Sequence, residues 1–167
     1  MSQPGSNPKI AAETLCSGEA TGEILWLDEP LSFWGGTSLS TGVITDVHHP
    51  QHGVSLAGRV VVMGASRGSS SSSSVLAEQI RAGVAPAAIL LTSRDAIVTL
   101  GALAAAEVYG IQLPILLLDA VGLAGLPRSG QITVNAVEGS AFVLASNQLH
   151  DPCPPGAMGV FGAPEAS

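Results

Sequence analysis

Charge is scarce in this sequence: charged residues make up 11% of its 167 residues, and basic residues are the rarer kind. Six Lys and Arg stand against 13 Asp and Glu, which gives a formal net charge of -7. No basic run or aromatic-basic stripe occurs, so we expect no nucleic-acid partner. Hydrophobic residues make up 46% of the chain, so it is not disordered in bulk. With so few charges, we expect part of its surface to be buried against another chain.

Cysteine is scarce as well. Cys16 and Cys153 lie near opposite ends of the sequence and form no CxxC pattern. Two cysteines are too few for an iron-sulfur cluster or a structural zinc site, which typically need four thiolate or imidazole ligands. We therefore expect this chain to bind no metal by itself, with Cys16 a small buried strand residue and Cys153 an incidental thiol in the tail.

Long hydrophobic runs are missing. The apolar stretches at 96–108 and 111–118 are interrupted by Gly, Thr, Glu or Pro well before the roughly 20 residues that a membrane span requires. We predict no transmembrane helix. The first residues also lack a charged leader followed by an apolar core, so we expect no secretory signal and a cytoplasmic location.

What is present is an alternation of strand and helix patterns typical of an α/β fold. Helical spacing predicts helices at 71–82 and 97–109, the second with an apolar stripe through Leu100 and Val108. Two helices between three strands predict a parallel βαβαβ core over 60–117, and the flanking strands add an antiparallel layer. This order fits a three-layer β/β/α domain, with a flavodoxin-like sheet as the alternative. The predicted strands are 24–27, 43–45, 60–63, 88–91, 114–117, 132–134 and 142–144.

The domain boundaries follow from composition. Residues 1–10 are mostly polar and contain proline, which predicts a flexible N-terminal arm. Residues 150–167 are rich in proline and glycine, which predicts a flexible tail. At this length we expect a single domain between them, over residues 11–149.

The best candidate for a reactive site is the sequence MGASRGSS at 63–70, between a predicted strand and a predicted helix. Glycines permit a tight turn there, and the first N–H groups of the helix would point at its occupant. Such a turn attracts anions and would stabilise an alkoxide at Ser69, helped by Arg67. Serine runs such as 69–74 are more often linkers or helix caps, however, and the residues alone favour that interpretation.

Three further features carry candidate residues. The segment Ser32-Phe33-Trp34-Gly35-Gly36 is either a buried aromatic plug or one wall of a cleft or subunit interface. The loop from Asp46 to His52 contains three histidines, but its spacing is typical of a turn rather than a metal site. Asp95 is most simply a helix cap, although it lies near the same strand ends as the candidate turn.

These blocks together resemble the small, swivel-domain subunit of aconitase X, a partner of an iron-sulfur hydro-lyase. The resemblance covers roughly residues 15–143. It rests on LSFWGG at 31–36, TGVITD at 41–46, HP at 49–50, RGSS at 67–70 and GVAPAAI at 83–89.

The resemblance implies that Ser69 is the base that removes a proton from the substrate, with Arg67, Gly68 and Ser70 holding the substrate's anionic group. It also implies that His49 and the 32–36 segment line the cleft or the subunit interface. Other members of the superfamily often follow the Gly-Ser-Ser turn with Arg-Glu, where this chain has Ser71-Ser72. Arg67 is then the nearest cation available to replace that arginine.

The resemblance further implies a dehydratase that is active only with a large subunit, which would carry the iron-sulfur cluster. Two substrates are plausible within the family: cis-3-hydroxy-L-proline and mevalonate 5-phosphate. The alanine-rich composition and terminal extensions look bacterial and favour the hydroxyproline. A swivel domain that binds an anion without catalysis is the alternative from a different class.

Overall fold

An eight-stranded mixed sheet forms the framework of residues 8–145, which are the residues that the computed structural model describes. The spatial order of the strands is β1-β8-β7-β3-β4-β5-β6-β2. The strands are β1 (Lys9–Ala11), β2 (Glu13–Cys16), β3 (Gly18–Trp26), β4 (Val60–Met63), β5 (Ala88–Leu91), β6 (Ile115–Leu117), β7 (Gln131–Ala136) and β8 (Phe142–Ala145).

The parallel half of the sheet contains β3, β4, β5 and β6, with β2 antiparallel at its edge. Helix α2 (Ser71–Ala82) connects β4 to β5, and α3 (Ala96–Tyr109) connects β5 to β6. Both helices end at a glycine in the left-handed conformation, Gly83 and Gly110. The predicted parallel βαβαβ core is confirmed.

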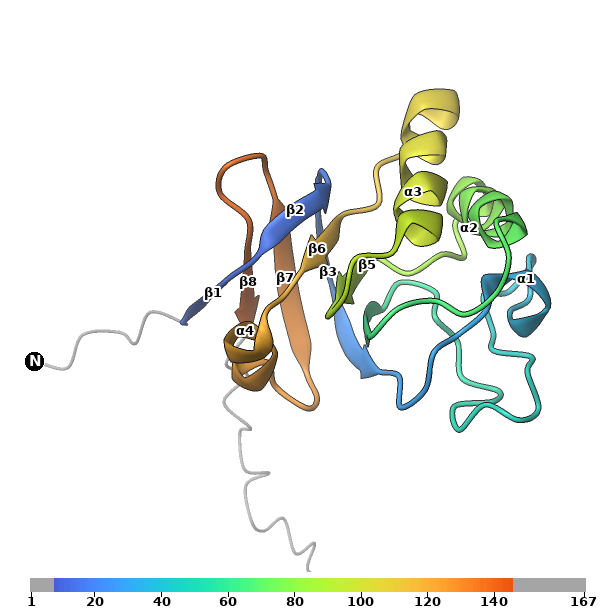
Figure 1. Cartoon of the computed structure of the whole chain (residues 1–167), viewed down its shortest axis with the longest axis horizontal. Coiled ribbons are helices and arrows are strands. Elements are labelled where there is room, and N and C mark those ends of the chain that lie inside the picture. The colour runs from blue at the N-terminus through green and yellow to red at the C-terminus, as the bar shows by residue number, and fades with distance from the viewer. Residues whose placement is uncertain (1–7, 146–167) are drawn as a thin grey trace, which may run out of the picture.

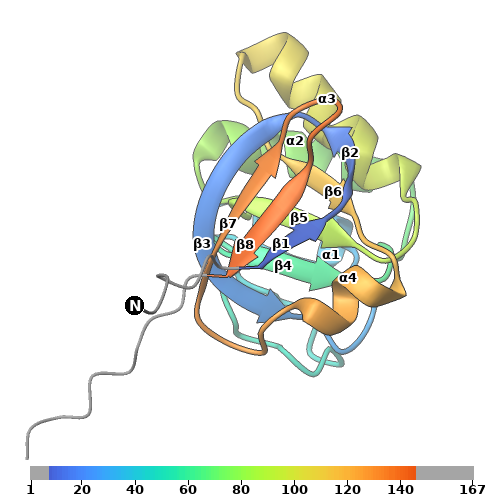
Figure 2. The same cartoon turned by 90° about the vertical axis from the view of Figure 1, so that its left-hand side faces the viewer.

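Strand β3 belongs to both halves of the sheet. Its residues 18–23 pair antiparallel with β7, whereas residues 24–26 pair parallel with β4. Strands β7, β8 and β1 complete the antiparallel half. Figure 2 shows the long curve of β3 that carries the sheet from one half to the other.

Figure 1 shows from the side that the domain has three layers. Two apolar cores lie between these layers. One joins α2 and α3 to the parallel half and includes Leu76, Ile89 and Val98. The other lies between the two halves of the sheet and includes Val62, Leu90, Ile132 and Val143. Because a second layer of strands covers the face opposite the helices, the three-layer β/β/α prediction is confirmed. The flavodoxin-like alternative is wrong, since it would have helices on both faces.

Two short helices lie at the same edge of the parallel half, where β4 and β6 end. Helix α1 (Phe33–Gly36) follows β3, and α4 (Ala120–Gly125) follows β6. The sequence patterns predicted neither of them, because one has only four residues with non-helical backbone at Trp34 and Gly35, and the other is only six residues long.

The N-terminal boundary and one strand differ from expectation. Lys9 and Ile10, expected in the arm, belong to β1, because Ile10 is buried between α4 and the sheet and pairs with Val143 of β8. Residues 43–45, expected as a strand, join no sheet and make only the isolated bridges Thr37 to Ile44 and Val43 to Ser55. The predicted tail at 150–167, with Cys153, lies outside the described residues.

The apolar stripe predicted for α3 is also wrong. Leu100 and Val108 are 57% and 69% exposed. The buried face of α3 instead consists of small residues and one valine: Val98, Gly101, Ala102 and Ala105. A methyl group on Gly101 would lie 2.8 Å from the Ser73 carbonyl oxygen, so close contact with α2 selects small residues for that face.

No helix among residues 8–145 is long and apolar enough to cross a lipid bilayer. Cys16 is the buried last residue of β2, as predicted.

Candidate functional site

The predicted reactive segment is a turn at residues 64–70 between β4 and α2, at the carboxyl end of a fully buried parallel strand. Ser69 and Ser70 are both exposed. Their carbonyl oxygens accept hydrogen bonds from the amides of Ser72 and Ser73, at 3.0 and 3.1 Å. Within residues 8–145 no acceptor pairs with the amides of Ser69, Ser70 and Ser71, so the 64–70 turn presents free N–H groups to solvent.

The serine run at 69–74 is neither a linker nor a side-chain helix cap, the two roles that such runs most often have. Residues 71–74 form the first turn of α2 and are not a linker, and the N-cap residue Ser70 makes no side-chain capping bond. Two serines of the run are structural instead. Ser72 is buried and its hydroxyl accepts a hydrogen bond from the amide of Trp34, while Ser73 donates one to the carbonyl oxygen of Ile97 at 2.7 Å. The buried serines hold α2 in place, and the exposed ones remain available for chemistry.

Gly68 brings the turn against the 32–36 segment. Its φ of +123° suits glycine alone, and a methyl group there would lie 2.7 Å from the Ser32 hydroxyl oxygen. Ser32 itself donates a hydrogen bond to the carbonyl oxygen of Trp34 at 2.8 Å. A second link joins the amide of Arg67 to the carbonyl oxygen of Leu31 at 3.0 Å. The structure therefore brings the two predicted segments together.

The 32–36 segment was expected to be either a buried aromatic plug or one wall of a cleft or interface, and its two aromatic residues differ in this respect. The Phe33 side chain is 1% exposed and belongs to the core under α2, whereas Trp34 is 61% exposed. Gly35, with a φ of +76°, reverses the chain between these orientations and the buried Gly36. Phe33 is thus the buried plug, and Trp34 is an outward-facing aromatic beside the 64–70 turn.

Arg67 forms an ion pair with Asp46, with 3.5 Å between Nη2 and Oδ2. The Arg67 side chain is 58% exposed. Asp46 lies in the 37–58 excursion between α1 and β4, and its Oδ1 accepts a hydrogen bond from the amide of His48 at 2.9 Å. Arg67 therefore carries a guanidinium with spare donors, two residues before the free amides of the turn begin.

His49 is buried, and both of its ring nitrogens have local partners. Nδ1 accepts a hydrogen bond from the amide of Gln51, and Nε2 lies 3.1 Å from the carbonyl oxygen of Glu29. Since Nδ1 accepts, Nε2 must carry the proton and donate to that carbonyl. His49 therefore braces a turn, in keeping with the turn interpretation of this loop, and its predicted role in the cleft or interface stays a prediction.

Asp95 caps α3, as predicted, and it also reaches the 64–70 turn, near which its position after β5 placed it. Its side chain accepts hydrogen bonds from the amides of Ile97 and Val98, and also from the amide of Ser66 in the 64–70 turn. Burial acts to raise the pKa of Asp95, but the hydrogen bonds from Ser66, Val98 and Ile97 outweigh it, so the pKa lies below its usual value. An ionised carboxylate thus ties the turn to the neighbouring helix.

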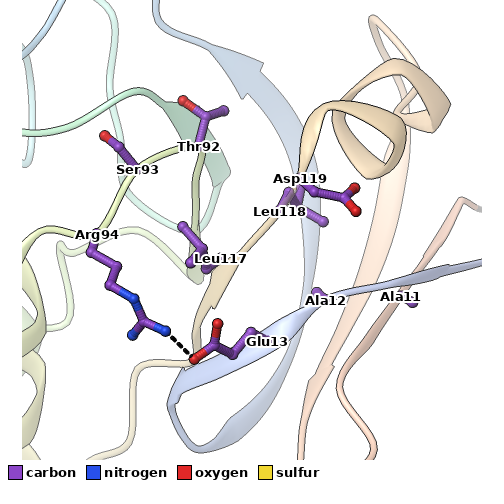
Figure 3. A pocket seen from close by; sticks show the side chains of 9 residues that line it. All are labelled: Ala11, Ala12, Glu13, Thr92, Ser93, Arg94, Leu117, Leu118 and Asp119. Atoms are coloured by element: carbon purple, nitrogen blue, oxygen red, sulfur yellow. Dashed lines mark hydrogen bonds and ion pairs between the residues drawn. The ribbon is translucent and has the colours of Figure 1, made fainter.

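A pocket of about 520 Å³ lies beside the turn, at the carboxyl ends of β5 and β6 (Figure 3). Its connection to the turn is Ser93, whose amide and hydroxyl both donate to the carbonyl oxygen of Gly64, at 3.3 and 3.0 Å. Figure 3 shows Arg94 reaching toward Glu13 in an ion pair. The second carboxylate, Asp119, accepts a hydrogen bond from the amide of Gly122. Both acids of the pocket are therefore already engaged. Its lining residues are Ala11, Ala12, Glu13, Thr92, Ser93, Arg94, Leu117, Leu118 and Asp119.

The donor set of residues 8–145 does not fit an iron-sulfur cluster. These residues contain no group of three or more His, Cys, Asp or Glu side chains placed to hold a metal ion. Burial raises the pKa of the Cys16 thiol to about 11, which disfavours the thiolate that a cluster needs as ligand.

Comparisons with known proteins agree on one family. The family model of the aconitase X swivel domain matches residues 9–143. The cis-3-hydroxy-L-proline dehydratase of Pseudomonas aeruginosa is 47% identical over 106 residues, which are 64% of this chain and 18% of that protein. The phosphomevalonate dehydratase small subunit of Thermococcus gammatolerans is 31% identical over 136 residues, which are 81% of this chain and 98% of that one.

The crystal structure of Thermococcus kodakaraensis aconitase X in its holo-form superimposes with a TM-score of 0.69 at 30% identity, covering 82% of this chain and 98% of that chain. The chain thus spans about a fifth of the length of the two hydroxyproline dehydratases that it matches, and nearly all of the Thermococcus gammatolerans small subunit.

Proposed function

Because this chain belongs to the aconitase X swivel-domain family, we propose that it is the small subunit of a hydro-lyase and supplies the base for the dehydration of a hydroxylated carboxylate. The observation that carries the proposal is the 64–70 turn. It combines an exposed serine, free helix N-terminal amides and a partly free arginine at the carboxyl end of a parallel strand.

Each residue of the turn has a role in this proposal. The Ser69 oxygen, as alkoxide, takes the proton from the carbon next to the one that carries the leaving hydroxyl group. The free amides of the turn and the Arg67 cation favour the alkoxide, because both place positive charge beside it. Arg67, Gly68 and Ser70 hold the substrate's carboxylate by charge and hydrogen bonds. Asp95 fixes the backbone at Ser66 so that these groups keep their geometry.

The substrate that we propose is cis-3-hydroxy-L-proline. Its support is the 47% identity to a dehydratase named for that substrate. Mevalonate 5-phosphate is the second candidate. It is favoured by a different observation, because this chain covers 98% and 95% of the length of two small subunits named for phosphomevalonate.

The proposal includes a large partner subunit in a cytoplasmic heterodimer. The relatives named small subunits support a partner, and so do the hydroxyproline dehydratases, in which the matched region is only about a fifth of a longer chain. Since the described residues of this chain do not fit an iron-sulfur cluster, the proposal places the cluster on that partner.

The test is to purify this chain from its own host without oxygen, together with whatever larger chain accompanies it, and to assay the complex on both substrates. We expect turnover of cis-3-hydroxy-L-proline. Ser69→Ala should lower kcat by about a thousandfold or more, since a general base contributes about a hundred- to ten-thousandfold. The complex should still assemble, because Ser69 is exposed and makes no side-chain contact that holds the fold.

Ser74→Ala is the matched control, because Ser74 is an exposed serine of the same run in the first turn of α2, and it should leave kcat unchanged. If the complex turned over mevalonate 5-phosphate and not cis-3-hydroxy-L-proline, mevalonate 5-phosphate would replace the hydroxyproline as the proposed substrate. Near-normal turnover by Ser69→Ala would remove the serine from the mechanism. A chain that purifies without a partner and binds carboxylates without turnover would point to an anion-binding domain instead.

A further inference from the structure

The Arg67 side chain is contacted by a second, distant segment of the chain, and we propose that Asp46 is a positioning residue that orients the Arg67 guanidinium toward the substrate's anionic group. The inference rests on the proposed function, and it adds a residue that lies 21 positions before Arg67 in the sequence. Neither the turn itself nor its flanking helix contains Asp46.

Asp46 is itself held in place. Its Oδ1 accepts the hydrogen bond from the amide of His48, which leaves Oδ2 to face Arg67. The backbone amides of Thr45 and Asp46 both donate to the carbonyl oxygen of Gly36, at 2.9 and 3.4 Å. The Asp46 side chain is only 22% exposed. A carboxylate fixed in this way gives the long arginine side chain a defined direction.

Arg67 is attached at two points and still keeps binding capacity. Its backbone amide donates to Leu31, and its guanidinium reaches Asp46 through one contact of 3.5 Å. A guanidinium has several N–H donors in a rigid plane, so one long contact leaves the others for a second anion. With its side chain 58% exposed, Arg67 can grip a carboxylate or phosphate while Asp46 limits its swing.

Arg81 in α2 provides a comparison, because its guanidinium is fully engaged by a carboxylate. In α2, both Nε and Nη2 of Arg81 lie 2.8 Å from Oε2 of Glu78, whose other oxygen accepts a hydrogen bond from Tyr109. The Arg81 pair is short and doubly contacted, whereas the Arg67 pair is long and single. The difference is what we expect if Arg67 is oriented by its carboxylate rather than saturated by it.

The decisive variant is Asp46→Asn in the assembled enzyme, which keeps the shape and the contact with the His48 amide but removes the charge. The Arg67 side of the pair is open to solvent, and ion pairs of this kind contribute little to stability, so the variant should fold. We expect KM to rise about three- to fivefold, the size of effect that an exposed charge pair supports, with kcat within about twofold of the wild type. Glu78→Gln, which breaks the other α2 ion pair, is the matched control and should change neither constant.

Titration with pyrrole-2-carboxylate, a planar carboxylate similar in shape to the dehydrated product, measures the binding of an anion at Arg67 without turnover. We expect its Kd to rise by the same factor in Asp46→Asn. In an Arg67→Gln background, Asp46→Asn should add little, because the cation that it orients has gone.

An unchanged Kd and KM would overturn the inference, and so would a tighter Kd, which would mean that Asp46 only repels the substrate's anion. A fall in kcat with unchanged KM would also overturn it. If the wild-type complex turned over neither substrate, the proposed function would fail, while the Kd comparison would still decide the role of Asp46.

Discussion

The two long helices, α2 and α3, begin at the same edge of the sheet in opposite ways. The N-terminus of α3 is closed, because the Asp95 carboxylate accepts hydrogen bonds from the amides of Ile97 and Val98. The N-terminus of α2 is open, since Ser70 makes no capping bond and the first turn contains no acidic residue. A closed terminus stabilises its own helix, whereas an open one keeps its amides and its positive end for a ligand.

The two ends are also joined. The same Asp95 carboxylate accepts a hydrogen bond from the amide of Ser66, within the 64–70 turn that leads into α2. The closed end therefore supports the geometry of the open one. The two N-termini thus have different roles: that of α3 supports the turn, and that of α2 is open to a ligand. Substitutions at either N-terminus test this difference.

The largest effect is expected from Gly68→Ala, which strains the open end. A residue with a side chain is disfavoured at a φ of +123°, and its Cβ would lie 2.7 Å from the Ser32 hydroxyl oxygen. We expect the free energy of unfolding to fall by about 2 kcal/mol, and kcat/KM to fall at least a hundredfold because Ser69 moves. Urea unfolding and steady-state kinetics of the complex measure the two effects.

Gly139→Ala is the control for backbone strain alone. Gly139 has a φ of +82° and no atom within 4 Å of an added methyl group, and it lies between β7 and β8. It should lose about 1 kcal/mol of stability and no activity. Equal loss of activity in both variants would show that Gly68 has no particular role in the site.

A smaller effect is expected when the closed end is opened by Asp95→Ala. Loss of the cap and of the acceptor for Ser66 should lower the free energy of unfolding by about 2 kcal/mol near neutral pH, measured by urea unfolding. Asp95→Asn keeps an oxygen acceptor and should lose less. A stability loss confined to Asp95→Asn would contradict this account.

The same position predicts a pH dependence. Because the folded pKa of Asp95 lies below its ordinary value of 3.8, the ionised group stabilises the fold above about pH 4, and this contribution disappears as the pH falls through the folded pKa. The difference in unfolding free energy between wild type and Asp95→Asn should therefore shrink on acidification. A difference that grew toward low pH would mean that the carboxylate is not held ionised by its hydrogen bonds.

The smallest effect is expected when the open end is closed by Ser71→Asp. A carboxylate in the first turn of α2 should stabilise the helix by about 0.5 kcal/mol. It should also raise KM several-fold, because it competes with the substrate's anion for the same amides. The neutral Ser71→Asn is the control and should change KM much less. An unchanged KM in Ser71→Asp would indicate that the substrate does not use the helix N-terminus.

Sequence patterns predicted the inner strands and the two long helices and missed the edge strands β1 and β2. Strands β4 and β5 are runs of four buried apolar residues bounded by turns, and α2 has clear helical spacing. Strands β1 and β2 are short and partly polar, and they form only by pairing with β8 and β6, far away in the sequence. For α3 the largest apolar residues misled the prediction, because close contact at Gly101 reserves the inner face for small ones.

The part of the candidate site formed by consecutive residues could be predicted from the sequence, whereas the contacts between distant segments could not. The 64–70 turn follows from glycine and serine chemistry between a strand and a helix, so its place at the sheet edge was predicted correctly. The Asp46 contact to Arg67 and the Asp95 contact to Ser66 join residues 21 and 29 positions apart. No periodicity or motif indicates which distant side chains a turn will meet, since the three-dimensional path of the 37–58 excursion decides it.

The shared strand β3 has a mechanical consequence for a domain that is named for swinging. Its nine residues form one continuous backbone that hydrogen-bonds to the antiparallel half along residues 18–23 and to the parallel half along 24–26. Bending one half relative to the other would break those ladders and open the core between them. The domain should therefore move as a rigid body that carries Ser69, Arg67 and Asp46 together. If the proposed two-subunit enzyme is correct, any hinge then lies where this chain meets its partner.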